Sequence, residues 1–549
     1  MPPHVQDKMI ENNHLFGKKP QIEEYEVHDR IRKAKKPKSG VPGDLPRTLV
    51  QEFSPELSAP LSKIYNRITD TGEWPSPWKL EHGIPLQKIN NPENEDDLRV
   101  ISLTSFYSKV YEKFVMEWLL DHIGHLIDWH QYGGQKGNGV AHYLIDFINF
   151  VQYNQDLKNI HAVLAVAIDF SKAFNRQNHN ILITLLSDLG VPGWLLKLVV
   201  GFLENRELIV KYKGETSEKL KLPGGGPQGT ILGMFLFLVL INAAGFKEAI
   251  KNTGEVITKP FNRRGPLHKI HLKFIDDLTV AEAINLKSKL VPNPNPNPPR
   301  PLPYHGRTGH VLADGQSEVQ KLLLDLNTYV DHHQMKINQK KTKVILFNNS
   351  RKYDFPPQLG FDDNDDDVLE VVEELRLLGV VVASNLNWQA HVDYMCTKAF
   401  NRLWMIRRLK PLGATTDELI EVYQTQIRCI LEFAVAAWNS GITKAQINQL
   451  ERVQKCALAI ILQENYLSYK HALSTVNLES LQDRRHALCL KFARKAQKHP
   501  KFTKWFCPNI QTGVDTRSEK KNLKPVQSRT CRFEKSPIAY LTRLLNENP

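Results

Sequence analysis

The spacing of hydrophobic positions in the first 170 residues predicts two kinds of element. In "FYSKVYEKFVMEW" hydrophobic residues recur every four positions, as in a helix with one apolar face, and Thr104 stands before them as a candidate N-cap. These residues are Phe106, Val110, Phe114 and Trp118. "HAVLAVAIDF" (161–170) is instead a short continuous apolar run, which is typical of a strand covered on both faces. We therefore expect helices and loops over residues 46–160 and a buried strand after them.

The next hundred residues predict more helices and then an antiparallel hairpin. "QNHNILITLLSDLGVPGWLLKLVVGFL" has a helical pattern that "GVPG" interrupts, and "RELIVKYKG" has the pattern of a strand. The Gly-rich "LPGGGPQGT" precedes the apolar run 231–246, which predicts a buried helix because a bilayer span needs roughly 20 residues. Hydrophobic residues alternate from Ile270 to Phe274, which predicts a half-buried strand, and "LTVAE" can return antiparallel to it. The pair Asp276 and Asp277 would then lie at the turn.

The pattern becomes mostly helical in the last third of the chain. "MKINQKKTKVILF" predicts a loop that leads into a strand, and "EELRLLGVVV" predicts another strand. Three amphipathic helices follow, "HVDYMCTKAFNRLWMIRRLK", "TDELIEVYQTQIRCILEFAVAAW" and "TKAQINQLERVQKCALAIILQ". In the first of them, one face carries Val392, Met395, Ala399, Leu403 and Ile406, and the basic residues lie elsewhere: Lys398, Arg402, Arg407, Arg408 and Lys410.

Three polar or proline-rich segments do not fit any regular element. "VPNPNPNPPRPLP" (291–303) predicts a stiff, extended insertion that cannot be a helix or a central strand. "DDNDDD" (362–367) lacks the glycine and glutamate spacing of an EF-hand, so we expect a solvated loop. Residues 1–45 form a basic arm around "RIRKAKKPKSG", which is either solvated, in contact with phosphates or a nuclear-import signal.

The composition indicates a globular protein of several lobes with an excess of positive charge. The 549 residues are 41% hydrophobic and 24% charged, and Lys plus Arg (72) exceed Asp plus Glu (59), for a net charge of +13. This excess favours a polyanionic partner, although many basic proteins share it. The six cysteines form no CxxC pair, and the N-terminus lacks the apolar core of a secretory signal. We therefore expect reduced, mostly buried thiols in an intracellular protein of the nucleus or cytoplasm, without membrane association.

Three aspartates follow predicted strands, and their charges need an explanation. Asp169 ends the buried strand, and Asp276 and Asp277 lie at the hairpin turn. Adjacent carboxylates repel each other, so they are either solvated in an ordinary turn or held around a cation. If the strands are neighbours, the three carboxylates converge at one edge of the sheet, which suits two divalent ions about 3.5 to 4 Å apart. Magnesium prefers such oxygen ligands.

Several ordered motifs resemble those of reverse transcriptases from non-LTR retrotransposons. "VAIDFSKAF", "GGGPQGTILG" and "KFIDDL" are similar to the polymerase motifs, and "LRVISLTSFYSKVYEKFV" is similar to a motif of the fingers. "MKINQKKTKVILF" resembles the lysine-bearing motif after the catalytic hairpin, "LRLLGVVV" the primer-grip hairpin, and "LERVQKCALAII" a downstream helical segment. The resemblance covers roughly residues 38–480.

The resemblance implies a role for each matching residue. Asp169, Asp276 and Asp277 correspond to the catalytic triad that binds two Mg²⁺ ions, or Mn²⁺. Phe174 matches the aromatic residue next to the sugar C2′, although core packing is the alternative. The other nucleotide-binding positions are Lys88 and Arg99 of the fingers, Gln228 and Gly229 of the "PQG" turn, and Lys341, which matches a lysine that protonates pyrophosphate. Any Gly-Pro turn would share the glycines, and Lys341 could be an ordinary surface lysine, with Lys340 serving instead.

The resemblance implies an α+β right-hand polymerase with an antiparallel-sheet palm. We expect helical and looped fingers over 46–160, the palm over 161–385 with its insertion at 291–303, a helical thumb over 386–465 and a C-terminal helical and basic region over 466–549. The implied activity is RNA-directed DNA polymerisation. Its partners would be an RNA template, a DNA primer, their RNA–DNA hybrid and deoxynucleoside triphosphates. Salt should weaken this binding.

The chain departs from the family pattern at three positions, and two other functions stay open. Asn175 stands where relatives have a second Asp that is not a metal ligand, Ile275 replaces Ala and Met234 replaces Pro, so we expect little loss of chemistry.

The alternatives are a catalytically silent, domesticated or decayed RNA-binding protein and a maturase-like splicing factor. An intact triad argues against the first, and "LERVQ" against the second. The 37 residues before "KSGVPGDLP" are too few for an endonuclease domain.

Overall fold

The computed structural model describes most of the chain, in segments separated by gaps. They are residues 19–35, 40–89, 91–158, 160, 162–171, 174–242, 269–284, 290–292, 310–312, 317–348, 359–361, 368–509 and 523–548. Most of the proline-rich insertion (293–303) and all of "DDNDDD" (362–367) lie outside the described residues. Strands β9 (Leu290–Pro292) and β10 (His310–Leu312) pair antiparallel, so the described ends of the insertion meet.

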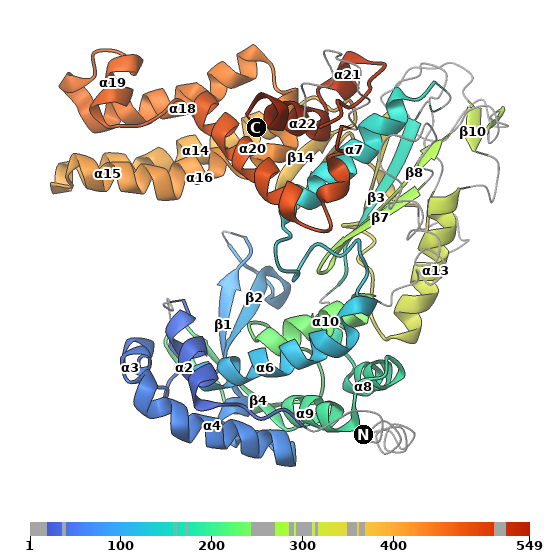
Figure 1. The fold of residues 1–549 in the computed structure, drawn as a ribbon, viewed down its shortest axis with the longest axis vertical. Coiled ribbons are helices and arrows are strands. Elements are labelled where there is room, and N and C mark those ends of the chain that lie inside the picture. Colours follow the sequence, from blue (N-terminus) through green and yellow to red (C-terminus); the bar gives the residue numbers. More distant parts are fainter. Residues whose placement is uncertain are drawn as a thin grey trace. The chain divides into compact units, whose positions relative to one another are not determined.

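The chain divides into two compact units, each built from several stretches of the sequence (Figure 1). Unit 1 comprises Met1–Asp128, Phe170–Gly245 and Leu326–Ile337. Unit 2 comprises Trp129–Asp169, Phe246–Asp325 and Asn338–Pro549. Helix α13 (Glu318–His332) is divided between them.

Unit 1 contains a sheet that the hydrophobic pattern does not predict. Strands β2 (Leu98–Leu103), β1 (Leu80–Gln87), β4 (Arg206–Tyr212) and β5 (Glu215–Thr216) lie in that order, and β6 (Leu220–Leu222) pairs with β4. The prediction of only helices and loops over 46–160 is therefore wrong. The segment "LEHGIPLQ" has no clear alternation, and it becomes a strand by pairing with β2 and, in parallel, with β4 more than a hundred residues away.

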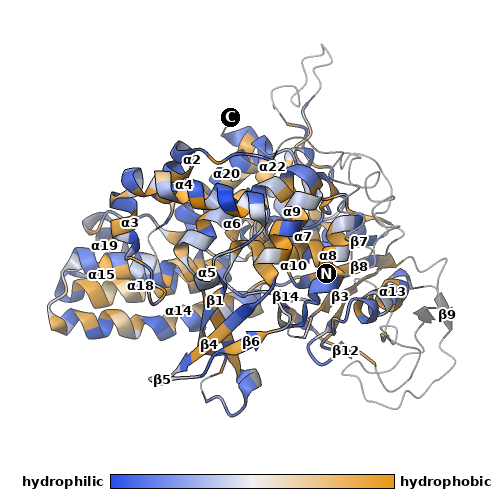
Figure 2. Cartoon of the chain, turned by 90° about the horizontal axis from the view of Figure 1, so that it is seen from below, coloured by the Kyte–Doolittle hydropathy of each residue, from blue (hydrophilic) through white to orange (hydrophobic). Residues whose placement is uncertain are grey.

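Unit 1 also contains eight described α-helices, and a distant carboxylate binds the N-terminus of one of them, α6. The α-helices are α2 (Glu24–Lys33), α3 (Arg47–Glu52), α4 (Ser54–Thr71), α5 (Ser76–Lys79), α6 (Phe106–Ile123), α8 (His179–Asp188), α9 (Gly193–Leu203) and α10 (Ile231–Asn242). The predicted Thr104 cap is wrong: Ser105 is the N-cap, and the Asp44 carboxylate accepts the Phe106 N–H at 2.8 Å. The predicted apolar helix is confirmed as α10, which is orange in Figure 2 and buried along most of its length.

Unit 2 is built on a second sheet, with β3 near its centre. The order is β12 (Glu370–Val371), β11 (Lys343–Asn348), β3 (Ala162–Ile168), β8 (Asp277–Ile284) and β7 (Lys269–Phe274). Strand β3 is buried as predicted and pairs antiparallel with both β11 and β8. Helix α7 (Val140–Asp156) packs against β3 and β7.

Strand β7 is buried on both faces, so the prediction of a half-buried strand is wrong. Leu272 is fully buried, and so are its polar neighbours His271 and Lys273, which are 3% and 0% exposed. The edge of β7 is covered by residues near Gln131, which forms a parallel bridge with Lys273. A strand at the edge of a sheet is thus covered by a loop.

The rest of unit 2 is helical after a hairpin of β13 (Glu374–Leu377) and β14 (Val380–Ala383). The helices are α14 (Gln389–Leu409), α15 (Thr416–Val422), a π-helix (Tyr423–Arg428), α16 (Cys429–Leu431), α17 (Val435–Trp438), α18 (Lys444–Leu462), α19 (Tyr469–Thr475), α20 (Leu481–Lys498), α21 (Cys531–Glu534) and α22 (Pro537–Glu547). The predicted apolar face of α14 is confirmed, because all five of its residues are buried. The prediction of one helix through "TDELIEVYQTQIRCILEFAVAAW" is wrong, since Ala434 takes a left-handed φ of 50° between α16 and α17.

Two expectations from composition can be compared with the structure. All six cysteines lie in described segments and are free thiols, but only Cys396 and Cys489 are buried, so the prediction of mostly buried thiols is wrong. Among the helices that the structure describes, none has both the length and the apolar character that crossing a membrane requires.

Candidate active site

Pairing of the central strands of unit 2 brings the three predicted aspartates together. Ile168 of β3 is opposite Leu278 of β8, so Asp169, the next residue, follows the strand towards the end where Asp277 begins β8. Phe274 pairs with Asp277, which leaves Ile275 and Asp276 as a two-residue turn. The hairpin with the Asp pair at its tip is therefore as predicted, and it lies beside the strand that ends in Asp169.

The three carboxylates destabilise each other's charge. The pKa of Asp277 is raised to about 6. The largest cause is the partial burial of its carboxylate, and the negative charges of Asp276 and Asp169 add to it, although part of the residue is exposed. The pKa of Asp169 is also raised by burial, and the nearby Lys341 opposes this effect. A divalent cation would relieve this repulsion, and carboxylate oxygens are the ligands that Mg²⁺ prefers. The residues present therefore fit such an ion.

A tight turn before β11 places Lys341 near the aspartates. The Asn338 N–H donates to the backbone oxygen of Asp169 at 2.7 Å, and the Lys341 N–H donates to the Asn338 oxygen at 3.1 Å. The Thr342 hydroxyl accepts the Asp169 N–H at 3.4 Å. Lys341 is exposed, as is Lys340, but it is Lys341 whose charge acts on Asp169.

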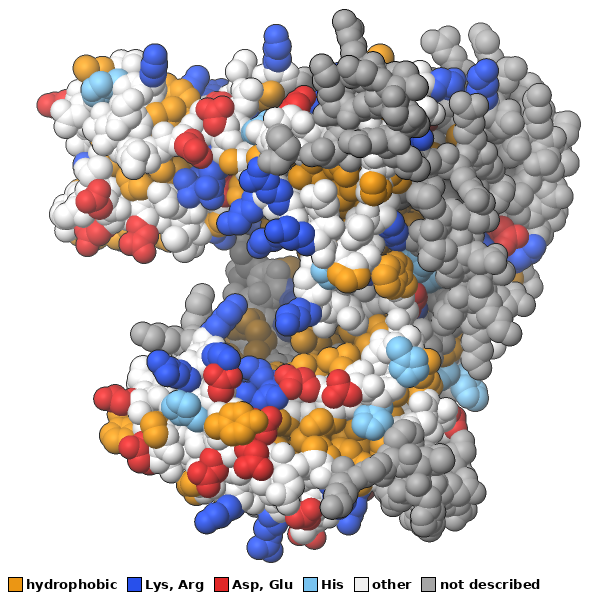
Figure 3. All heavy atoms as spheres, in the orientation of Figure 1, with side chains coloured by type: hydrophobic (Ala, Val, Ile, Leu, Met, Phe, Trp, Pro, Cys, Tyr) orange, Lys and Arg blue, Asp and Glu red, His pale blue; other side chains and the backbone are white. Residues whose placement is uncertain are grey.

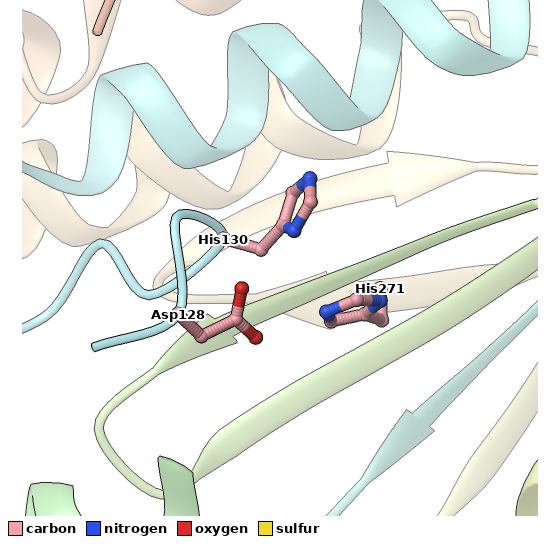
Figure 4. Close-up of side chains that lie close together, drawn as sticks. All are labelled: Asp128, His130 and His271. Atoms are coloured by element: carbon pink, nitrogen blue, oxygen red, sulfur yellow. The ribbon is translucent and has the colours of Figure 1, made fainter. Parts of the chain in front are cut away.

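The loop that covers β7 supports the hairpin of β7 and β8, and the sequence patterns did not indicate this loop. The Lys273 N–H donates to the His130 oxygen at 2.9 Å, and the Tyr132 N–H donates to the Lys273 oxygen at 2.8 Å. Figure 4 shows His130 and His271, whose rings lie edge to face with centroids 4.5 Å apart. Asp128, also labelled there, ends unit 1 two residues earlier in the chain. The signal available was the glycine-rich "QYGGQKGNG", which fits no regular element.

Lys88 and Arg99 lie in unit 1, where the connecting loop joins β1 to β2. Arg99 is in β2, opposite Leu86, and Lys88 is the first residue after β1. Both are exposed. The Lys88 N–H donates to the Asp97 oxygen at 2.7 Å, which fixes the start of the connecting loop.

The "PQG" turn, also in unit 1, is fixed against β2. The Ser102 N–H donates to the Gln228 oxygen at 2.9 Å. Gly229 has a φ of +114°, and a Cβ there would lie 2.5 Å from the Ser102 oxygen, so both conformation and space require glycine. Gly226 donates to the Phe174 oxygen at 2.6 Å, which links this turn to the residues after Asp169.

Phe174 is half-buried, and its ring lies against α10. The centroids of the Phe174 and Phe237 rings are 4.6 Å apart, and Phe237 is fully buried. This contact would hold the ring of Phe174 in place in either of the two roles predicted for it. Unit 2 thus contains Asp169, Asp276, Asp277 and Lys341, and unit 1 contains Lys88, Arg99, Phe174, Gln228 and Gly229.

The sequence is also similar to known proteins. Residues 89–289, from the β1–β2 hairpin past the Asp pair, match the family described as "Reverse transcriptase (RNA-dependent DNA polymerase)". This part of the chain is similar to reverse transcriptases. A Drosophila melanogaster protein named "Probable RNA-directed DNA polymerase from transposon BS" is 21% identical over 447 residues, which cover 80% of this chain and 44% of the relative.

A second Drosophila melanogaster relative, "RNA-directed DNA polymerase from mobile element jockey", is 29% identical over 182 residues, or 33% of this chain and 20% of the relative. These matches confirm the prediction of a reverse transcriptase of the non-LTR retrotransposon type. The chain spans less than half the length of these curated relatives.

Proposed function

We propose that this reverse transcriptase chain is an RNA-directed DNA polymerase that extends a DNA primer on an RNA template. The observation that carries the proposal is the convergence of Asp169, Asp276 and Asp277. Burial, together with the charges of the other two carboxylates, raises the pKa of Asp277 to about 6. Charges that repel in this way suit a site for two Mg²⁺ ions, or Mn²⁺. When bound, the ions would activate the primer 3′-hydroxyl and neutralise charge on pyrophosphate.

The protein groups around that chemistry are proposed to bind and orient the nucleotide. The cationic Lys88 and Arg99 would hold the triphosphate, and Lys341 would give a proton to the leaving pyrophosphate. Gln228 and Gly229 would lie along the nucleotide, in a turn whose conformation is fixed against β2. Phe174 would lie against the sugar. In the language of right-hand polymerases, the sheet of unit 2 is the palm, the β1–β2 region the fingers and the helices from α14 to α18 the thumb.

Helix α14 is proposed to contact the RNA–DNA hybrid. Trp404 is 57% exposed, and Arg407 and Arg408 follow it on the exposed part of the helix. Exposed aromatic rings beside arginines are typical of surfaces that bind nucleic acid, where bases stack and phosphates pair with cations. We place this activity inside the cell, in the nucleus or the cytoplasm.

The test is primer extension on an RNA template with labelled deoxynucleotides and Mg²⁺. Asp276→Asn should lower extension at least ~100-fold, because it removes a carboxylate that neutralises the metal charge, while affinity for the primer–template changes far less. Asp393→Asn, at an exposed aspartate of α14, is the matched control and should extend normally. If the wild-type chain binds the hybrid without extending it, the chain is the silent RNA-binding protein instead.

A further inference from the structure

The turn that holds the catalytic aspartates contains a residue in an unusual backbone conformation. Ile275, the first residue of the turn, has a φ of +60°. Such turns favour glycine there, and a β-branched residue at positive φ is a genuine outlier, because its Cβ crowds the backbone. Strained residues of this kind persist only when the surrounding structure holds them. In the sequence, Ile275 differs from the family pattern only by replacing an alanine. Some contact in the structure must therefore hold its backbone at positive φ.

The contact that holds this turn is made by the side chain of Gln131. Gln131 is 1% exposed, and its Oε1 accepts the Ile275 N–H at 3.0 Å and the Gly133 N–H at 2.9 Å. Both of these groups are hydrogen-bond donors, so the amide oxygen of Gln131 must face them. In the opposite orientation of the amide, its NH₂ group would face two N–H groups. One oxygen atom therefore connects the covering loop to the strained residue next to Asp276.

Gln131 itself is firmly placed by its backbone. It bridges Lys273 of β7, and its own oxygen accepts a hydrogen bond from Lys501 Nζ at 3.1 Å. Gly133 closes the arrangement from the other side, since a Cβ there would lie 2.6 Å from the Ile275 nitrogen. All of these residues belong to unit 2. The loop thus fits closely against the turn, with no space for a larger side chain at Gly133.

The Nε2 of Gln131 gives a second indication that the residue is present for its oxygen. This nitrogen is buried and has no hydrogen-bond partner among the residues that the structure describes. A buried donor without a partner costs stability, and each such group in a native structure calls for an explanation. Methionine would fill the same space without that cost. The two hydrogen bonds to the oxygen are the benefit that only the amide supplies.

We propose that Gln131 is a positioning residue, which holds Ile275 in its left-handed conformation and thereby aims Asp276 and Asp277 at the metal ions. This positioning role of Gln131 rests on the proposed polymerase function only in assuming that the aspartates bind metal ions. Gln131 would not touch substrate. It acts through the turn, in the way that residues behind metal ligands orient those ligands.

The test compares Gln131→Met in two backgrounds. In the wild-type chain, amide hydrogen exchange at Ile275 should speed up, and Mn²⁺ binding, followed by paramagnetic resonance, should weaken ~10-fold or more. The Mg²⁺ concentration for half-maximal extension should rise by a similar factor. In an Ile275→Gly chain the same substitution should have a much smaller effect on Mn²⁺ binding, because glycine adopts positive φ without support.

Gln454→Met is the matched control. Gln454 is also 1% exposed, and its amide is bonded to Tyr423 and to the backbone of Glu479 in the helical part of unit 2. Its loss should lower stability but leave Mn²⁺ binding and the Mg²⁺ requirement unchanged. If Gln131→Met does not fold, Gln131→Asn replaces it, because its oxygen falls one methylene short of Ile275.

Two results would overturn the positioning role: unchanged Mn²⁺ affinity in Gln131→Met, or an equal loss in the wild-type and Ile275→Gly backgrounds. Exchange and Mn²⁺ binding do not require polymerisation. A chain that never extends primers, but in which Gln131→Met weakens Mn²⁺ binding as expected, would contradict the proposed function and support the positioning role.

Discussion

Asp276, Asp277 and Ile275 are neighbours in the sequence, and two of them are in a costly state in the metal-free protein. Ile275 is held at positive φ, which costs on the order of 1–3 kcal/mol. The pKa of Asp277 is raised to about 6 by burial and by the charges of Asp276 and Asp169. Both residues therefore lower the stability of the protein, and the proposed cation site would explain why they are kept.

Replacing Asp277 by Asn should stabilise the metal-free protein while it abolishes extension. The pKa of Asp277 lies above its ordinary value, so ionisation opposes folding, and this penalty is complete above pH 6 and disappears as pH falls below that value. Since the residue is partly solvated, we expect a gain of roughly 1 kcal/mol. Denaturant unfolding in EDTA at pH 7.5 measures it. Equal stability of variant and wild type at that pH would show that the carboxylates do not interact.

Phe174 should decide between deoxynucleotides and ribonucleotides. A ring against C2′ rejects a 2′-hydroxyl by overlap and leaves it without a hydrogen-bond partner, and ~100-fold discrimination corresponds to about 2.7 kcal/mol. Phe174→Val should raise the efficiency of ribonucleotide incorporation at least ~10-fold relative to that of deoxynucleotide incorporation. This change corresponds to a fraction of that free energy, and single-nucleotide insertion kinetics measure it.

The control for Phe174 is another phenylalanine of unit 1. Phe235→Val truncates a buried side chain of α10 and should lower stability without changing sugar selectivity. An unchanged ratio of efficiencies in Phe174→Val would leave Phe174 with a packing role alone.

At the scale of elements, the helix after the "PQG" turn depends on a carboxylate from another helix. Glu112 of α6 is fully buried, and its carboxylate accepts the N–H groups of Ile231 and Leu232 at 2.7 and 3.1 Å. It also accepts the Ser108 hydroxyl at 2.9 Å. A negative charge is favourable at a helix N-terminus, where the first N–H groups lack partners. Glu112 therefore fixes the start of α10 and, through it, the end of the turn.

Glu112→Gln should lower the free energy of unfolding by about 1–3 kcal/mol, because it removes the charge at the helix N-terminus and puts an amide nitrogen in place of one of the two carboxylate oxygens. Denaturant unfolding measures the loss. The control is Glu117→Gln on the same helix, since Glu117 is about half exposed in its ion pair with Arg30 and should matter by less than ~1 kcal/mol. Equal effects of the two substitutions would mean that the cap contributes nothing.

The sequence predicted elements well where the evidence is local. The buried face of α14, the strand that ends in Asp169 and the hairpin at Asp276 follow from spacing within about twenty residues. The sheet of unit 1 could not be found this way, because β1 depends on a parallel partner in β4. The break in the helix at Ala434 was not predicted, because the apolar pattern continues through this residue. Only its backbone conformation, with a positive φ, interrupts the helix.

The same distinction applies to the candidate site. Asp169, Asp276, Asp277 and Lys341 were found because each stands in a recognisable motif, and the structure brings them together in unit 2. Gln131 was not, because an isolated glutamine carries no signal, and its contact with Ile275 joins residues 144 positions apart. Residues that support a site through such contacts become visible only in three dimensions.

At the scale of the whole molecule, charge is the property that a nucleic acid would meet first. The net charge is +13, and Figure 3 shows Lys and Arg side chains gathered on the visible face of unit 2. Lys398, Arg407 and Arg408 of α14 are exposed. Binding through phosphates releases counterions, so affinity depends on the number of such contacts and on the salt concentration.

The logarithm of the affinity for an RNA–DNA hybrid should therefore fall linearly with the logarithm of salt concentration, and removing phosphate contacts should flatten that slope. The Arg407→Gln/Arg408→Gln double variant should reduce the slope by about 2, at about 1 per arginine, with little dependence on the hybrid's sequence. Fluorescence anisotropy across a salt series measures this. The matched control is Lys63→Gln/Arg67→Gln on α4, which removes the same charge from exposed positions of unit 1. An equal reduction by both pairs would mean that net charge, and not contact at α14, sets the affinity, and the proposed role of α14 would have to be abandoned.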